Sequence, residues 1–150
     1  MQPRSARNKM MDYLAKRDHS VSEIKLKLKK AKFTDSEIAS AIEYGVQNNW
    51  LPNSPESNTK LSEKVAESLH RKGKGIHYIN QYLAQKGLPE IKNTDELELE
   101  KAFRLVKNKF SGKDLTDKAV KAKLGRFLVS RGFEMSIVRK VIFNLRQERD

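Results

Sequence analysis

The stretch "HRKGKGIH", residues 70–77, has the residue types best suited to binding chemistry. Arg71, Lys72 and Lys74 stand among two glycines, just before an expected helix whose first apolar residue is Ile76. Backbone N–H groups at a helix start, with cations beside them, can hold a phosphate or a carboxylate. The spacing is not the G-x-x-x-x-G-K-[ST] of nucleotide-binding loops. The stretch therefore predicts either an anion site or a plain turn between two helices.

No group of residues has the spacing of a catalytic or metal site. His19, His70 and His77 occur in separate contexts and are expected to be ordinary helix-terminal or surface residues. The acidic run "DELELE", residues 95–100, suits the positive end of a helix better than a metal ion. The serines have no nearby base, and the absence of cysteine excludes thiol chemistry and disulfides. We expect a protein that is not an enzyme and uses no cofactor or metal.

The positive charge is concentrated at the two ends of the chain. The net charge is +12. Residues 1–35 hold ten Lys or Arg and four Asp or Glu, and residues 118–150 hold nine and three, so each end carries +6. The residues between them are neutral overall. Two basic ends favour an anionic partner gripped at separated points, either nucleic acid or an acidic protein surface. The alternative is a protein of high pI without such a partner.

The sequence has no feature typical of a membrane or exported protein. No apolar run approaches the roughly 20 residues that span a bilayer. The basic start "MQPRSARNKM" is not followed by the apolar segment of a signal peptide. We expect a soluble cytoplasmic protein that acts as a monomer.

The stretch "SVSEIKLKLKK", residues 20–30, is compatible with a strand or a helix. Apolar residues alternate with lysines, which is the pattern of a half-buried strand. Ser20 and Glu23, however, have the spacing of a capping box that starts a helix. On a helix one face would hold Ile24, Leu28 and Ala31, with Leu26 beside it. The lysines would then fan across the solvated surface. The helix is favoured because the same pattern recurs elsewhere.

Three segments share one template. They are "IKLKLKKAKF" (24–33), "INQYLAQKGL" (79–88) and "LGRFLVSRGF" (124–133). Each has an apolar residue, a leucine four positions later and another apolar residue five positions after that. Gly87 and Gly132 stand where a helix would end in a left-handed turn. Another helical stretch is expected after each template, and in the second copy it would carry Ile91.

The template predicts an all-α protein built from tandem three-helix units that form an elongated, curved molecule. The repeats are expected at residues 5–50, 57–94 and 95–149. The Pro-, Ser- and Asn-rich residues 51–60 predict a linker between the first two. Units of this size have marginal cores alone. The expected core residues are Leu28, Leu83, Leu128 and Phe133.

A three-helix unit also resembles a helix-turn-helix DNA-binding module. The third helix of such a module should carry base-reading Arg, Asn or Gln. The stretch "SEIASAIEYGVQNN" has no arginine, whereas "MSIVRKVIFNLRQ" is better supplied. Because most cations lie on the second helices, charge-driven contact is favoured over sequence reading. A stand-alone helical DNA-binding module remains the alternative.

Three motifs together resemble the RecX regulators of the bacterial recombinase RecA. They are "YLAKRDHSVSEIKLKLKK" (13–30), "RKGKGIHYINQYLAQKGL" (71–88) and "KLGRFLVSRGFEMSIVRKVI" (123–142), and they occur in the family's order. The resemblance covers residues 8–148. It implies tandem three-helix repeats without catalytic residues. It also implies binding along the groove of the RecA–DNA filament, with modulation, usually inhibition, of RecA in recombination, DNA repair and the SOS response.

The chain departs from the family pattern after the first unit. The family usually has glycine, an aromatic residue, leucine and two aspartates there. This chain has Asn49-Trp50-Leu51-Pro52-Asn53 and about five extra residues before "KLSEKVAE". The missing carboxylates can alter the strength or mode of binding.

The expected partners are the RecA filament and the phosphates of single-stranded or duplex DNA. We predict that nine cations form the anion-facing surface. These are Lys25, Lys29, Lys32, Arg71, Lys72, Lys74, Lys123, Arg126 and Arg131.

Overall fold

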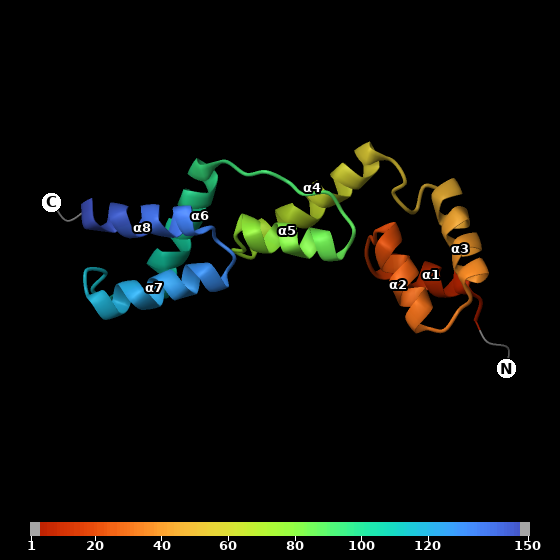
Figure 1. Cartoon of the computed structure of the whole chain (residues 1–150), viewed down its shortest axis with the longest axis horizontal. Coiled ribbons are helices and arrows are strands. Elements are labelled where there is room, and N and C mark those ends of the chain that lie inside the picture. The colour runs from red at the N-terminus through yellow and green to blue at the C-terminus, as the bar shows by residue number, and fades with distance from the viewer. Residues whose placement is uncertain (1–3, 148–150) are drawn as a thin grey trace. The chain divides into compact units, whose positions relative to one another are not determined.

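The computed structural model describes residues 4–147, and side chains up to residue 145. Within this range the chain forms helices and no strand. The helices are α1 (Ala6–Lys16), α2 (Val21–Lys30), α3 (Asp35–Gln47), α4 (Pro55–Arg71), α5 (Ile76–Gln85), α6 (Asp95–Lys109), α7 (Lys118–Ser130) and α8 (Met135–Gln147) (Figure 1). The predicted all-α class is confirmed, whereas the elongated, curved shape stays a prediction.

Contacts divide the chain into two compact units. The first comprises residues up to 64 together with 83–89, and the second comprises 65–82 together with the residues from 90 onward. Among the described residues, no helix is both long and apolar enough to cross a membrane.

The alternating sequence of residues 20–30 forms the helix α2 and not a strand. The side chain of Ser20 accepts a hydrogen bond from the backbone N–H of Glu23, and the Glu23 carboxylate accepts one from the N–H of Ser20. This capping box satisfies two N–H groups that a helix start leaves free. Ile24 and Leu28 are then fully buried, while Leu26 is 53% exposed. Burial of the i, i+4 pair decides for the helix, because a strand would place Leu26 on their side.

The first unit contains a core made by α1, α2 and α3. Its buried apolar residues are Ala6, Met10, Ile24, Leu28, Ile38, Ala41 and Leu51. Thr34 and Glu37 form a second capping box at the start of α3, as their spacing predicts. At the other end of α3 the chain turns at Asn49, whose φ is 59°, and the N–H of Trp50 donates to the carbonyl of Gly45. The stretch that departs from the family pattern therefore begins by closing α3.

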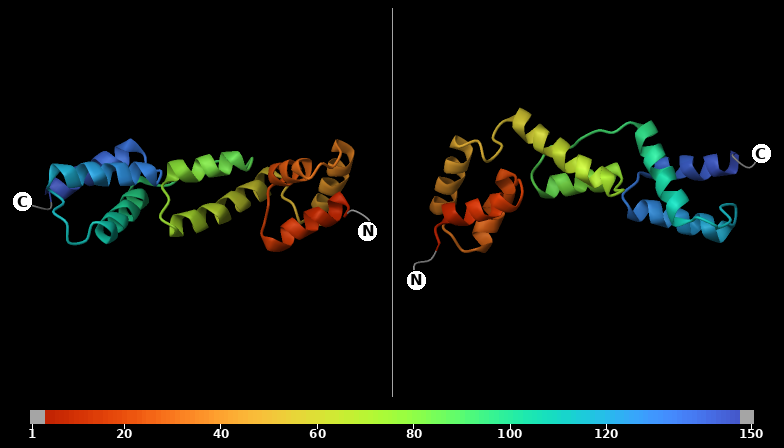
Figure 2. Two further views of the ribbon diagram at one scale, coloured as in Figure 1. Left: turned by 90° about the horizontal axis from the view of Figure 1, so that it is seen from below. Right: turned by 180° about the vertical axis from the view of Figure 1, so that it is seen from behind.

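The second unit contains a core made by α6, α7 and α8. Its buried apolar residues are Ala102, Val106, Phe110, Leu124, Leu128, Phe133, Ile137, Val138, Val141 and Leu145. The views in Figure 2 show α7 and α8 side by side, with α6 against α8. The four predicted core residues are all buried: Leu28, Leu83, Leu128 and Phe133.

The shared template forms the same turn in all three copies. The N–H of Phe33, Leu88 or Phe133 donates to the carbonyl of the leucine five positions before it, at 2.9–3.2 Å. The residue before each donor is left-handed: Gly87 has φ 68° and Gly132 has φ 92°. This is the expected helix-ending motif. Lys32 adopts the same conformation with φ 69°, although a side chain disfavours it.

The helix expected around Ile91 is absent, and that prediction is wrong. Residues 89–94 are not helical. Pro89 disfavours helical backbone in the residue before it and has no N–H to donate. The side-chain amide of Asn80 instead donates to the carbonyl of Ile91 and accepts from its N–H, both at 3.0 Å. Residues 57–94 therefore contain two helices.

The expected linker is mostly ordered. Leu51 is buried in the first core, and residues 55–60 form the first turns of α4. The division of the chain into repeats 5–50, 57–94 and 95–149 stays a prediction.

Candidate functional site

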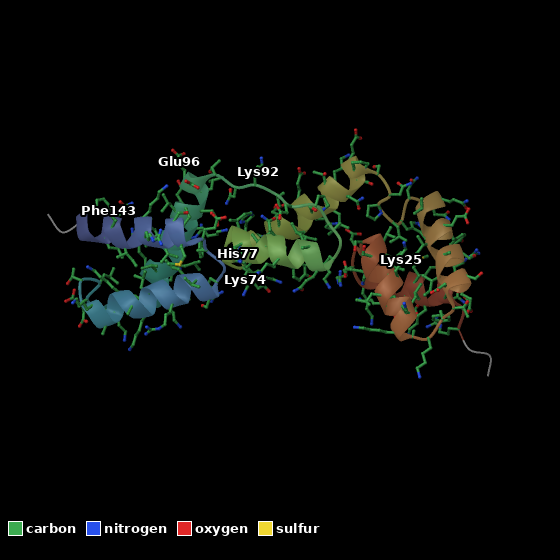
Figure 3. The ribbon with its side chains drawn as sticks, viewed as in Figure 1. Lys25, Lys74, His77, Lys92, Glu96 and Phe143 are labelled. Carbon is green, nitrogen blue, oxygen red and sulfur yellow. The ribbon has the colours of Figure 1, made fainter. Side chains whose placement is uncertain are left out.

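The solvated side of α2 carries the clearest cationic surface. Because Ile24 and Leu28 face the core, Lys25, Lys29 and Lys32 are exposed, and none of the three forms an ion pair with a described residue. Lys25 is labelled on this helix in Figure 3. These three predicted residues therefore share one helix and its terminal turn.

The single carboxylate of α2 is used inside the fold. Glu23 is buried, and its Oε2 lies 2.7 Å from Arg17 Nη2 and 3.3 Å from Lys86 Nζ. Burial alone would raise the pKa of Glu23, but the hydrogen bonds from Arg17 and Ser20 outweigh it and hold the pKa below its usual value. Glu23 therefore does not neutralise the exposed lysines.

Lys27 differs from the other lysines of α2. Its Nζ lies 2.7 Å from His19 Nε2 and 5.0 Å from the ring of Tyr13. His19 Nδ1 donates to the carbonyl of Arg17 at 2.9 Å, so Nε2 is free to accept from Lys27. His19 stands directly before the N-cap of α2, so it is helix-terminal as expected, but it is buried and not a surface residue.

The glycine-rich stretch 70–77 is a turn whose N–H groups are already occupied. The N–H of Gly75 donates to the carbonyl of Arg131 at 2.8 Å, and that of His77 donates to the carbonyl of Gly132 at 3.0 Å. The N–H of Ile76 donates to Glu98 at 2.8 Å. A carboxylate does bind this helix start, but it belongs to the chain itself. The alternative of a turn between helices is therefore the one observed.

Only glycine fits at the contact between this turn and the end of α7. A Cβ atom on Gly75 would lie 2.4 Å from the backbone carbonyl of Gly132. A Cβ on Gly132 would lie 2.2 Å from the Cβ of Tyr78. Both distances are far below ordinary contact. The two glycines thus position α5 against α7 within the second unit.

Glu98 and Lys101 form a buried ion pair that joins α6 to this turn. The two residues are 2% and 4% exposed, and Lys101 Nζ lies 2.6 Å from Glu98 Oε2. The ammonium also donates to the carbonyl of Lys74 at 2.6 Å and to His70 Nδ1 at 2.7 Å. The side chain of Asn93 donates to Glu98 at 2.7 Å. All three ammonium protons therefore have acceptors.

The pKa values of the buried His19 and the half-buried His70 are both lowered. Burial, and then the positive charge of a neighbouring cation, lowers the pKa of His70; burial is also the main cause for His19. Each ring uses one nitrogen as an acceptor for a lysine, which a protonated ring cannot do. The sequence gives no sign of these partners, since Lys101 lies 31 positions from His70.

Acidification is expected to destabilise the protein because of these two histidines. Their pKa values in the folded state lie below the ordinary 6.5, so the unfolded chain binds more protons as the pH falls through 6.5. The free energy of unfolding should therefore decrease below this pH, and urea titrations monitored by circular dichroism would measure it. His70→Gln should reduce the slope, whereas His77→Gln, at an exposed histidine, should not. An unchanged slope in His70→Gln would contradict the assignment.

The remaining predicted cations have mixed environments. Lys72, Lys123 and Arg126 are exposed, while Arg71 is paired with Glu67 at 3.2 Å on the surface. Lys74, labelled with His77 near the start of α5 in Figure 3, is half-buried.

Two of the predicted cations of the second unit lie against aromatic rings. The Lys74 ammonium lies 4.6 Å from the ring of Tyr78, and the Arg131 guanidinium lies 5.4 Å from the ring of Phe127. The structure brings Arg131 near Lys72, whose carbonyl lies 3.5 Å from the guanidinium. Among the described residues, no three His, Asp or Glu are placed to hold a metal ion.

Comparisons with known proteins identify the family. The protein-family model described as the RecX first three-helix domain matches residues 6–44 of this chain. The family model described as the RecX third three-helix domain matches residues 95–142. The regulatory protein RecX of Acinetobacter baylyi is 33% identical over 139 residues, which cover 90% of this chain and 84% of the relative. The regulatory protein RecX of Leptothrix cholodnii is 32% identical and covers 92% and 87%, respectively.

A solved structure agrees in fold. The crystal structure of RecX from Lactobacillus salivarius has a TM-score of 0.71 and 21% identity, and the match covers 95% of each chain. The predicted resemblance is thereby confirmed, and the chain belongs to the RecX family of regulatory proteins.

Proposed function

We propose that the protein modulates the RecA recombinase, mainly as an inhibitor, by binding along the RecA–DNA filament through its basic surfaces. The observation that carries this proposal is the exposed lysine cluster of α2 and its terminal turn, Lys25, Lys29 and Lys32, none of which forms an ion pair with a described residue. Solvated cations of this kind are available to phosphates or to acidic side chains of a partner. Family membership points to a regulatory role and makes the filament the first partner to test.

The mechanism needs no reacting group in this protein. Cations that bind across a filament groove compete with the movements and ligands that the filament requires, so occupancy alone can inhibit. The exposed cations Lys123 and Arg126 on α7 would supply a second contact region. In this proposal the protein works in the cytoplasm as a monomer, and DNA phosphates assist its binding to the recombinase.

The first experiment compares three binding partners across a salt series. These are the RecA–ATP–single-strand filament, bare single strand and bare duplex. Selective binding to the filament, with a lower RecA ATPase rate, is the expected result. Equal or tighter binding to bare duplex would overturn the proposal in favour of a stand-alone DNA-binding module. The structure offers that alternative little support, because Lys140 on α8 is paired with Asp95 at 3.1 Å and α3 carries no Lys or Arg.

Removing the charges of the α2 cluster is expected to weaken filament binding without harming the fold. The variant combines Lys25→Gln, Lys29→Gln and Lys32→Gly. Glycine is chosen at position 32 because its φ of 69° strains any side chain. If all three lysines contact phosphates, the slope of log affinity against log salt should fall by about 0.9 for each.

A matched variant separates this cluster from general charge. Lys16→Gln, Lys60→Gln and Lys92→Gln remove the same charge from exposed positions outside the predicted surface. This control should keep nearly the parent affinity. Parent-like binding by the α2 variant would exclude the cluster from the interface.

A further inference from the structure

A groove lies between α7 and α8 in the second unit. It has a volume of about 470 Å³. Its lining residues are Lys121, Ala122, Gly125, Arg126, Val129, Ser130, Met135, Val138, Arg139 and Ile142. Val129 is 48% exposed and Met135 is 51% exposed, so the groove presents apolar surface to water. Together with Val138 and Ile142 these residues form a contiguous apolar lining, which makes the groove a candidate interaction site.

The charges around the groove all have one sign. Lys121, Arg126 and Arg139 are its charged lining residues, and none forms an ion pair with a described residue. An apolar floor edged by cations is complementary to an apolar side chain flanked by carboxylates. Methionine at the edge adds adaptability, because its unbranched side chain fits anchors of different shape.

The floor of the groove is kept open by a glycine that the fold does not need. Gly125 lies in the middle of α7, where glycine is less favourable than alanine. A Cβ atom there would meet only Ile142 Cδ1 at 3.8 Å and Val138 Cγ1 at 3.9 Å, which are ordinary contacts. Its backbone is not left-handed. The missing side chain thus serves no packing within the described chain, and it leaves room for an atom group from outside.

The first unit has a corresponding groove with a different lining. Positions exactly one hundred earlier line a groove between α2 and α3: Ser22, Lys25, Leu26, Lys29, Asp35, Ile38 and Ala39. The groove therefore follows from the way the second and third helices pack in each unit. Its chemistry differs, because Lys25 takes the place of Gly125 and Asp35 takes that of Met135. The open floor and purely cationic edge belong to the α7–α8 groove.

We propose that the α7–α8 groove binds an acidic segment of a partner protein, which inserts one apolar side chain above Gly125. The cations Lys121, Arg126 and Arg139 would face the carboxylates of that segment. A protein is preferred to nucleic acid because a phosphate backbone offers no aliphatic anchor for the apolar floor. The inference deepens the proposed function and rests on it for the source of the segment, which would be a recombinase subunit.

A peptide probe tests the groove without the recombinase. The probe is a synthetic helical peptide of glutamate and alanine with one central leucine, titrated into the isotopically labelled full chain. Saturable NMR shifts at α7 and α8 are expected. Gly125→Leu, which fills the groove, should weaken binding by about tenfold or more, the loss typical of a blocked anchor pocket. Gly125→Ala also replaces glycine by a residue that favours a helix, but it leaves the groove open. This variant should bind the peptide nearly as the parent does.

Further outcomes of this titration decide against the inference. Absence of shifts at α7 and α8, or equal binding by Gly125→Leu and the parent, would overturn it. A change in sedimentation of the free chain on Gly125→Leu would show that a second copy covers the groove. Loss of duplex binding rather than peptide binding would assign the groove to nucleic acid. The control Ala119→Leu adds the same side chain to an exposed position of α7 outside the groove.

The filament experiment distinguishes this inference from the proposed function. A photo-crosslinking amino acid in place of Met135 should link to an acidic, apolar-containing segment of RecA. If the parent binds filament but Gly125→Leu binds equally and the crosslink goes elsewhere, the groove inference fails and the function stands. If the parent does not bind filament, the proposed function fails and the peptide titration still decides the groove.

Discussion

Replacing Glu98 by alanine is expected to destabilise the second unit by about 3–5 kcal/mol, the usual loss when one partner of a buried ion pair is removed. The Lys101 ammonium would stay buried without its carboxylate, and the N–H of Ile76 and the side chain of Asn93 would lose their acceptor. Urea unfolding followed by circular dichroism measures the change. Hydrogen exchange should show the largest loss of protection at the start of α5 and in α6.

Two companion variants separate charge from hydrogen bonding at Glu98. Glu98→Gln keeps an oxygen for the N–H of Ile76, so its loss should be smaller than that of alanine. Glu98→Ala with Lys101→Met removes both charges and should recover part of the stability, since a buried pair gains little over apolar packing. A loss below about 1 kcal/mol in Glu98→Ala would mean that water readily reaches Lys101.

Truncating Leu128 to alanine is expected to cost about 2–5 kcal/mol, through lost apolar burial and the cavity left behind. Leu128 lies on the core-facing side of α7 and is fully buried, in the cluster that also contains Leu124 and Val141. Its carbonyl also accepts the N–H of Phe133 in the turn that ends α7. The midpoint of urea unfolding should fall, with the exchange protection of α6, α7 and α8 lost together.

The control for Leu128 is its neighbour on the same helix. Val129→Ala removes apolar atoms from a side chain that is 48% exposed, and surface changes of this kind stay within about 0.5 kcal/mol. Similar losses for Leu128→Ala and Val129→Ala would contradict the observed burial.

Several helix ends could be predicted from the sequence because their hydrogen bonds are local. Ser20 with Glu23, and Thr34 with Glu37, are three positions apart, so the pattern contains both partners. The turn at Gly132 likewise joins residues only five positions apart. The left-handed backbone of Lys32 could not be predicted, because lysine has no preference for that conformation. Its φ is imposed by the same turn that glycine permits elsewhere.

The predicted site was only partly determined by these local patterns. The exposed position of Lys25 and Lys29 follows from burial of the i, i+4 pair on α2. The environment of Lys74 does not, because it depends on α6, where Lys101, 27 positions away, donates to the Lys74 carbonyl. Pro89 already indicates that no third helix begins there. The pairing of the Asn80 side-chain amide with the Ile91 backbone could be seen only in the tertiary structure.

The sequence by itself determined the helical class, the repeated turn, the core leucines and the family, since each depends on residues close together in the chain. Only the tertiary structure showed that the glycine-rich turn holds the chain's own Glu98, 22 positions from Ile76. It alone brought His70 to Lys101 and left Gly125 open beneath the α7–α8 groove. The physical reason is that buried charges and grooves depend on partners from different helices, and helix packing rather than sequence spacing brings those partners together.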